Sequence, residues 1–242
     1  MSQNNQIKQY NFTQEHITKL CQMQDQLNTY IHPEWKTQGF NWDLAIVDEC
    51  MEIHGHLGWK WWKKDYKVGL TEANKKQVQL EVIDILHFVV SKNMEESWSA
   101  GYVLSAINDF IITGDSLEQW LKYVTVQAAD ENIDISDWPQ LAALVGLTEQ
   151  EILETYTQKY VLNKFRQDHG YKDGSYCKEW EIITGIGEII DGVGQGYITT
   201  LFEDNEYLSR IVAMIEHEGQ DTTDEIELYN RLELAYNSRL NQ

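Results

Sequence analysis

Two pairs of acidic residues stand inside apolar segments of this chain. Glu49 and Glu52 lie in DLAIVDECMEIHGHLGWKWWKK, and Glu81 and Asp84 lie in QVQLEVIDILHFVVS. Residues three apart occupy the same face of a helix, so each segment presents two carboxylates side by side. A carboxylate is costly to bury unless a partner or a bound cation compensates its charge. Four such groups brought together would form a site for a divalent cation.

A competing interpretation is that these acids reflect the overall composition. The chain has 39 Asp and Glu against 19 Lys and Arg, a net charge of −20, so acids three apart are frequent. Most of them, such as Glu131 and Asp134, lie in polar stretches and are typical of solvated helix faces. The two apolar pairs differ in context, and salt bridges to Lys or to a distant segment are the alternative for them. No Arg occurs before Arg166.

The chemistry of the four side chains indicates the kind of cation. Mg²⁺ takes oxygen ligands and usually completes its octahedral shell with water and substrate phosphate. The absence of His and Cys from the two pairs argues against zinc. We therefore expect metal-assisted chemistry on a phosphate compound, with the two pairs facing each other from antiparallel helices.

Two further segments could bind an aromatic, phosphorylated ligand. Between the acidic pairs, GWKWWKK at 58–64 combines three Trp with three Lys. One interpretation packs each Trp in the core with the Lys head groups in water, and it is favoured for any single Trp. The other gives a base a stacking face and a phosphate a cation. Further along the chain, Lys159, Asn163 and Arg166 share one helical face within a basic and aromatic stretch.

The composition excludes several classes of protein. With 242 residues and 42% hydrophobic content, the chain can bury a sizeable core. Its acidic balance argues against a nucleic-acid polymer as partner, because phosphate backbones are bound by clustered Lys and Arg. No apolar run reaches the ~18 residues of a membrane helix, and the N-terminus lacks a signal-peptide pattern, so we expect a cytoplasmic protein that does not contact membranes. Cys21, Cys50 and Cys177 lack the spacing of a disulfide framework or a thiolate zinc site.

The spacing of apolar residues predicts an all-α fold, a helical bundle. The chain has 2 Pro, and strand signals are weak throughout. We expect a single helical domain over residues 1–242 with a less regular C-terminal portion. A glycine-rich stretch at 185–196 is predicted to be a loop or a broken helix, and GxGxxG after a strand is absent from it. The predicted helices cover residues 12–28, about 41–56, about 71–93, 98–112, 117–129 and 148–168.

Local signals set several of these boundaries. Thr71 is a candidate N-cap, and Thr148 with Glu151 has the pattern of a capping box. Gly58 and Gly170 follow predicted helices and are candidate stop signals.

The motifs DExxE-x₆-WKWWKK, QxxLExxDxxHFxxS and YxxKxxxNxFRxDxGYKxGxYxKxW occur in this order. Together they resemble the dimeric dUTPases of the all-α NTP pyrophosphatase superfamily, from Gln24 to about Trp180, with a further match at 203–205. The resemblance implies a homodimer that hydrolyses dUTP, and often dUDP, to dUMP. It also implies metal-binding helices at about 10–100, a phosphate-clamping helix and loop at about 148–180, and a C-terminal extension at about 181–242 with an insertion near 185–197.

The same resemblance implies roles for individual residues. Mg²⁺ would be held by Glu49, Glu52, Glu81 and Asp84. From the four carboxylates in apolar segments and the cationic helix we further expect two or three Mg²⁺ ions, with Glu49 as the catalytic base. The implied substrate contacts are Gln24 and Asn28 on uracil, Trp62 near the base, Asn163 near the sugar, Lys159, Arg166, Lys172 and Lys178 on the phosphates, and Tyr171 in the same clamp.

Some positions depart from the family pattern, and two alternative functions compete with this one. Members carry an acid shortly after the second Glu, where this chain has His54 and Gly55, and an Asn where it has His169. A related pyrophosphatase for another nucleotide, such as dCTP, would keep the four acids with a different base reader. A helical dimerisation or regulatory protein would instead pair its buried acids with cations.

Overall fold

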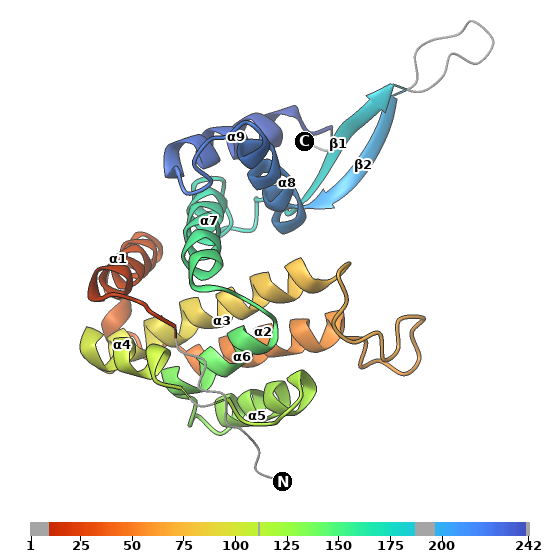
Figure 1. The fold of residues 1–242 in the computed structure, drawn as a ribbon. Coiled ribbons are helices and arrows are strands. Elements are labelled where there is room, and N and C mark those ends of the chain that lie inside the picture. Colours follow the sequence, from red (N-terminus) through yellow and green to blue (C-terminus); the bar gives the residue numbers. More distant parts are fainter. Residues whose placement is uncertain (1–9, 111, 187–196, 241–242) are drawn as a thin grey trace, which may run out of the picture. The chain divides into compact units, whose positions relative to one another are not determined.

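Residues 10–110, 112–186 and 197–240 are described in the computed structural model of this chain, which divides into two compact units, residues 1–159 and 160–242. The described residues are mainly helical, with one two-stranded sheet, which confirms the expected all-α fold (Figure 1). The expectation of a single domain over residues 1–242 stays a prediction. None of the helices in the described ranges is long and apolar enough to cross a membrane.

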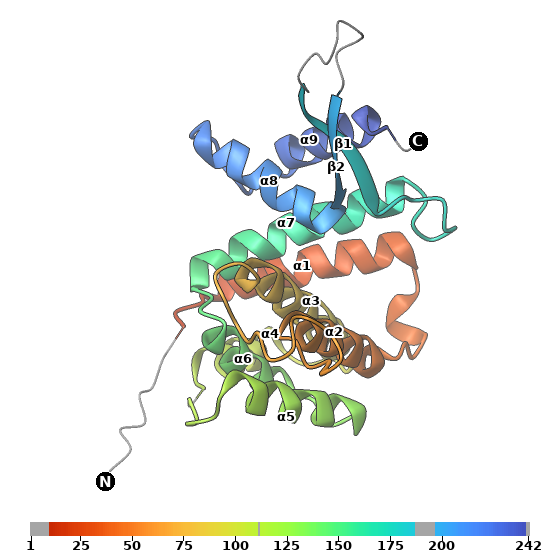
Figure 2. The same ribbon diagram turned by 90° about the vertical axis from the view of Figure 1, so that its right-hand side faces the viewer.

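The first unit is built from helices that pack around one central helix. Its α-helices are α1 (Gln14–Ile31), α2 (Trp42–His56), α3 (Lys75–Glu95), α4 (Ala100–Asn108), α5 (Leu117–Ala129), α6 (Trp138–Leu144) and the first half of α7 (Glu149–Asp168), with short 3₁₀ turns at Trp35–Thr37 and Ile135–Asp137. α3 is buried on almost every face between Val78 and Asn93, and the buried residues include polar and charged side chains as well as apolar ones. It packs against α1, α2 and α6, so it is the core of the unit (Figure 2).

α2 and α3 form an antiparallel pair joined by the loop at 57–74, as Figure 1 shows. Asn41 caps the start of α2 by accepting a hydrogen bond from the Leu44 backbone N–H. Gly58 follows its end with φ +76°, and a Cβ there would lie 1.9 Å from the backbone oxygen of Asp65. The predicted stop at Gly58 is therefore confirmed, because no other residue fits this turn without strain.

Most of the predicted helices of this unit are confirmed, with shifts at their ends. The ranges of α2 and α5 agree with the predictions, and α4 ends at Asn108 rather than at 112. The prediction that Thr71 caps α3 is wrong. α3 begins at Lys75 after Asn74, and Thr71 and Asn74 bond to each other one turn earlier. The Thr71 hydroxyl accepts from the Asn74 backbone N–H, so it caps the turn at 71–74 and not α3 itself.

α7 begins and ends as its sequence signals indicate. The Thr148 backbone N–H donates to the Glu151 carboxylate, and the Glu151 N–H donates to the Thr148 hydroxyl, which forms the predicted capping box. After the last turn, Gly170 has φ +89°, and a Cβ there would collide with the Ser175 hydroxyl. This confirms the predicted stop at Gly170.

The second unit contains a hairpin and two helices that the sequence did not predict. They are β1 (Glu179–Ile186), β2 (Tyr197–Glu203), α8 (Asp204–His217) and α9 (Glu225–Ser238). The strands are antiparallel, with a bulge between Ile183 and Gly185 that interrupts the alternation of buried and exposed side chains. Of the glycine-rich stretch at 185–196, all but the first two residues lie outside the described residues.

An aromatic cluster forms the core of this second unit. The rings of Phe165, Trp180 and Tyr236 contact one another at centroid distances between 5.4 and 6.1 Å. All three side chains are buried. They connect the last part of α7 to the hairpin and to α9.

Candidate active site

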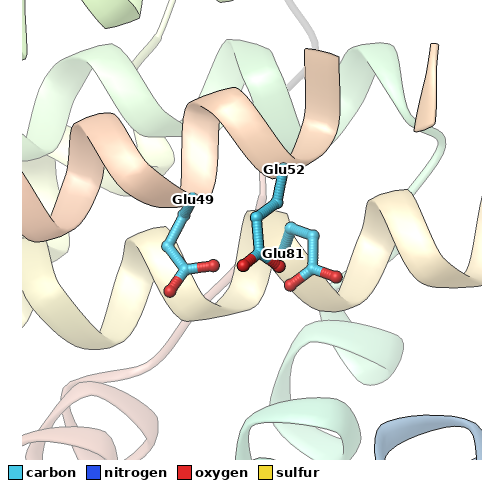
Figure 3. A group of neighbouring side chains, drawn as sticks. All are labelled: Glu49, Glu52 and Glu81. Atoms are coloured by element: carbon cyan, nitrogen blue, oxygen red, sulfur yellow. The ribbon is translucent and has the colours of Figure 1, made fainter. Parts of the chain in front are cut away.

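Three carboxylates meet between α2 and α3. Glu49 and Glu52 extend from α2, and Glu81 extends from α3 toward them (Figure 3). Each offers an oxygen that lies within 4.8 Å of the others. The spacing of three on α2 places its two acids on one face, and the antiparallel packing of α3 brings the third acid opposite them.

The cluster carries more negative charge than its surroundings compensate. Glu81 is 3% exposed. The pKa of Glu49 is raised from its ordinary 4.5 to about 9, first by burial and then by the nearby charges of Asp84, Glu81 and Glu52. Lys159 acts in the opposite direction but does not cancel these effects. Oxygen ligands with unbalanced negative charge are the donor set that suits a hard divalent cation.

Asp84 lies near Glu49 but is not one of the three acids whose oxygens meet within 4.8 Å. Its carboxylate forms an ion pair with the Lys159 ammonium, with 2.6 Å between Asp84 Oδ2 and Lys159 Nζ. The Lys159 side chain is 1% exposed. The structure thus brings together three of the four predicted metal ligands, while the fourth contacts the cation that was predicted to bind phosphate. The sequence places His56 on the same helical stripe as Glu49 and Glu52, and its Nε2 atom lies 3.4 Å from Glu81 Oε1.

The predicted uracil readers lie together on α1 and are both buried. The Gln24 amide N–H donates to the Asn28 Oδ1 atom at 2.9 Å, and the Asn28 amide N–H donates to the Ser91 hydroxyl at 2.9 Å. Gln24 Oε1 in turn contacts His87 and Tyr156. The sequence analysis did not identify Ser91, His87 and Tyr156 as functional residues. Polar side chains spaced four apart, at 24 and 28 and at 87 and 91, were a signal that could have indicated the first two.

The Trp residues of the loop after α2 are exposed. Trp59 is 44% exposed, Trp61 73% and Trp62 56%, and Trp62 contacts the other two rings edge-on. The interpretation that favoured burial of each Trp is therefore wrong. A loop between two acidic helices must remain open to solvent if it is to receive a ligand, and large exposed aromatic side chains there are available for stacking.

The second unit holds the remaining predicted substrate residues. Arg166 donates to both carboxylate oxygens of Asp204, at 2.9 and 2.7 Å, and to the Asn163 side-chain oxygen at 3.0 Å. Tyr171 is half-exposed, and both the Arg166 guanidinium and the Lys178 ammonium lie near its ring, at 5.8 and 5.3 Å.

Lys172 is exposed in the turn after α7. Asp204, the partner of Arg166, lies in the stretch at 203–205, whose resemblance to the family stays a prediction.

Comparison with known families decides the identity. A family model described as dUTPase matches residues 16–171, well over half of the chain. The chain belongs to the dUTPase family. This confirms the resemblance, and with it an enzyme that hydrolyses dUTP, a nucleotide substrate, and a family that generally uses a divalent metal. No curated protein matches the sequence.

The family assignment also decides between the alternative functions. It favours dUTP over another nucleotide such as dCTP, and it decides against a non-enzymatic dimerisation protein. The match covers the acidic helices of this dUTPase, α7 and the turn after it, and ends before β1. The family model does not describe residues 1–15 or residues 172–242, and the second of these segments contains the hairpin with α8 and α9.

Proposed function

We propose that this dUTPase requires Mg²⁺ and converts dUTP to dUMP and pyrophosphate, and dUDP to dUMP and phosphate. The observation that carries the proposal is the meeting of Glu49, Glu52 and Glu81 within 4.8 Å, with the pKa of Glu49 raised to about 9. Carboxylates crowded in this way repel one another unless a cation lies between them. A substrate with three or four negative charges needs the same cation for its phosphates.

Two or three Mg²⁺ ions would be held by Glu49, Glu52, Glu81 and Asp84. Bound Mg²⁺ supplies charge neutralisation for the phosphate oxygens and a water molecule of lowered pKa. The oxygen-only donor set and the buried position of Glu81 fit this role. Asp84 would complete the ligand set, and Lys159, which pairs with Asp84 in this structure, would provide a positive charge beside the metal and the substrate phosphates.

Glu49 is our candidate for the catalytic base. Burial and the neighbouring acids raise the pKa of this carboxyl in the absence of a metal. Bound Mg²⁺ would displace that proton, and the ionised Glu49 carboxylate could then accept a proton from the attacking water molecule. The dUMP then leaves with its sugar and base unchanged, and the second product is pyrophosphate or phosphate.

The base and the phosphates would be bound by separate groups. Gln24 and Asn28 carry amides that can match the carbonyl oxygens and the imide N–H of uracil, and Trp62 offers an exposed ring for the base. The groups proposed for the rest of the substrate are Asn163 for the sugar and Lys159, Arg166, Tyr171, Lys172 and Lys178 for the phosphates. Cations near the leaving group stabilise the charge that develops on it.

We also propose that the working form is a homodimer. Leu44 and Met51 on α2 expose 61% and 40% of their surface, which is unusual for apolar side chains on the helix that carries the metal ligands. A second copy of the chain would cover such residues. Sedimentation at several concentrations measures this directly.

The test of the activity is a panel of nucleotides. Purified protein is incubated with dUTP, dUDP, dCTP, dTTP, dATP and dGTP, with Mg²⁺ or with a chelator. We expect dUMP and pyrophosphate from dUTP, dUMP and phosphate from dUDP, and no turnover with chelator. Full dUTP turnover in the presence of chelator would contradict the role of the acidic cluster, and preferred turnover of dCTP would contradict the base assignment.

A further inference from the structure

The two predicted uracil readers belong to a closed chain of buried hydrogen bonds. Its members are Gln24 and Asn28 on α1, His87 and Ser91 on α3, and Tyr156 on α7, each less than a tenth exposed. The Ser91 hydroxyl donates to the backbone oxygen of His87 at 2.8 Å. Gln24 Oε1 lies 2.6 Å from His87 Nδ1 and accepts from the Tyr156 hydroxyl at 3.0 Å. Every amide atom of the two readers thus has a neighbour that limits how it can turn.

The direction of these bonds follows from Ser91. Its hydroxyl has one hydrogen, and because this hydrogen is donated to the His87 carbonyl, the Ser91 oxygen can only accept from Asn28. Asn28 must therefore turn its NH₂ toward Ser91 and its oxygen toward Gln24. Gln24 must then turn its NH₂ toward Asn28 and its oxygen toward His87 and Tyr156.

The hydrogen bonds to Gln24 Oε1, at the other end of this network, require the same orientation of the two amides. The Tyr156 hydroxyl donates to Gln24 Oε1, and the neutral His87 imidazole must carry its single hydrogen on Nδ1 to donate there too. Burial lowers the pKa of His87 to about 4, so the ring is neutral at ordinary pH. His87 is stacked on Tyr156 at a centroid distance of 3.8 Å, which holds both donors on the Gln24 oxygen.

The fixed orientation determines what the two amides can still offer to a ligand. Gln24 keeps one N–H, and Asn28 keeps one oxygen lone pair and one N–H. Because the Gln24 nitrogen is bonded to the Asn28 oxygen, this oxygen lies between the two nitrogens. The order is therefore donor, acceptor, donor. The edge of uracil presents carbonyl O4, N3–H and carbonyl O2, which is the complementary order.

Cytosine does not fit this arrangement. Its edge presents an amino group, an unprotonated N3 and carbonyl O2, so two of its three groups would face groups of the same kind. If the amides of Gln24 and Asn28 both turned over, the order would become acceptor, donor, acceptor. Such a row would match cytosine at two positions and uracil at none. The orientation of the amides, and not only their presence, therefore selects the base.

We propose that Ser91, His87 and Tyr156 are positioning residues that fix the amides of Gln24 and Asn28 in the orientation that accepts uracil and rejects cytosine. The inference rests on the proposed function, in which these two amides contact the base. It goes beyond that proposal by assigning specificity to three residues that need not touch the substrate.

The experiment compares dUTP with dCTP on the same protein preparation. The measured quantity is the ratio of kcat/KM for the two substrates, which does not depend on the fraction of folded enzyme. Ser91→Ala removes the group that orients Asn28, and we expect the ratio to fall by about tenfold, the effect of one neutral hydrogen bond. Tyr156→Phe removes one of the two donors to Gln24, and we expect a smaller fall in the same direction.

Two controls separate orientation from general damage. Ser91→Thr keeps a hydroxyl that can donate to the carbonyl four residues earlier, so it should restore the wild-type ratio. dTTP presents the same O4, N3–H and O2 edge as dUTP, so the ratio of dUTP to dTTP should not change in any of these variants. A merely structural role for Ser91 would alter the two ratios alike or neither of them.

Gln24→Leu distinguishes the two ways in which the idea can fail. If Gln24→Leu changes the ratio of dUTP to dCTP while Ser91→Ala and Tyr156→Phe leave it at the wild-type value, the positioning proposal is wrong and the base reader stands. If Gln24→Leu also leaves the ratio unchanged, the proposed contact between the amides and the base is itself wrong.

Discussion

Two sites of this dUTPase, one in each unit, hold buried charge in opposite ways. In the first unit, Glu49, Glu52 and Glu81 face one another across α2 and α3, and the pKa of Glu49 is raised to about 9 by burial and by its acidic neighbours. In the second unit, Arg166 and Asp204 are both buried, but they satisfy each other through two hydrogen bonds. One set of charges is unbalanced, and the other is neutral as a pair.

This difference identifies the carboxylate cluster as the group whose charge a bound cation would balance. Removing one partner of a compensated buried pair lowers the stability of the fold, because the other partner is then a buried charge without a counterion. An uncompensated group of like charges destabilises the protein until a ligand of opposite sign binds it. Removing one carboxylate should therefore have opposite effects on stability in the two units.

The largest effect is expected from Glu81→Gln. It removes a buried metal ligand, and we expect dUTP turnover to fall by about a thousandfold or more. With chelator present, the melting temperature should rise, because the substitution relieves repulsion with Glu49 and Glu52. Pyrophosphate release and thermal melting measure the two quantities, with Glu72→Gln on the exposed loop as the control. A variant that keeps wild-type turnover, or that melts at a lower temperature with chelator, would show that the cluster is not an unbalanced site.

The next effect is expected from Asp204→Asn in the second unit. It leaves the Arg166 guanidinium buried without its carboxylate, which should cost about 3 to 5 kcal/mol of stability. Urea denaturation measures this loss. Glu218→Gln is the matched control, because Glu218 pairs with Arg231 at the surface, where such pairs contribute little. Equal losses for the two variants would mean that burial of the Arg166 pair does not matter.

The sequence was sufficient to predict most helices of the first unit and the residues of the acidic cluster, for identifiable reasons. Helical spacing depends on local chemistry, and the cap at Thr148 and the stops at Gly58 and Gly170 are local signals. The acidic pairs were recognisable because they interrupt apolar segments, and their spacing placed them on one face.

What the sequence could not supply was the partner of each charged group. Lys159 and Arg166 lie on one helical face, but their contacts with Asp84 and Asp204 depend on segments far away in the chain. The hairpin was missed because the bulge at Ile183 and Gly185 shortens the alternating pattern. The exposed Trp residues were assigned to the core because composition does not show which loop remains open.

The smallest effect, and the one that tests the comparison most finely, is the pH dependence of magnesium binding. The pKa of Glu49 is about 9 in the folded protein against an ordinary 4.5. The stabilisation associated with its bound proton is therefore fully present below about pH 4.5 and is lost as the pH rises through about 9. Magnesium must displace this proton, so its affinity should rise with pH across the same window, by at most about tenfold per pH unit.

Thermal melting at pH 6 and pH 8.5, with and without saturating Mg²⁺, measures this linkage. The shift in melting temperature caused by Mg²⁺ should be larger at pH 8.5, because less of the binding free energy is then used to remove the proton from Glu49. Glu49→Gln has no proton to lose at this position, so any remaining Mg²⁺ shift should be nearly the same at the two pH values. Asp204→Asn, by contrast, should keep the wild-type pH dependence, because the charge that it disturbs is compensated within the second unit. If the shift in melting temperature caused by Mg²⁺ does not increase with pH in the wild-type protein, the charges of Glu49, Glu52 and Glu81 are already compensated without a metal. The contrast between the two sites would then be wrong.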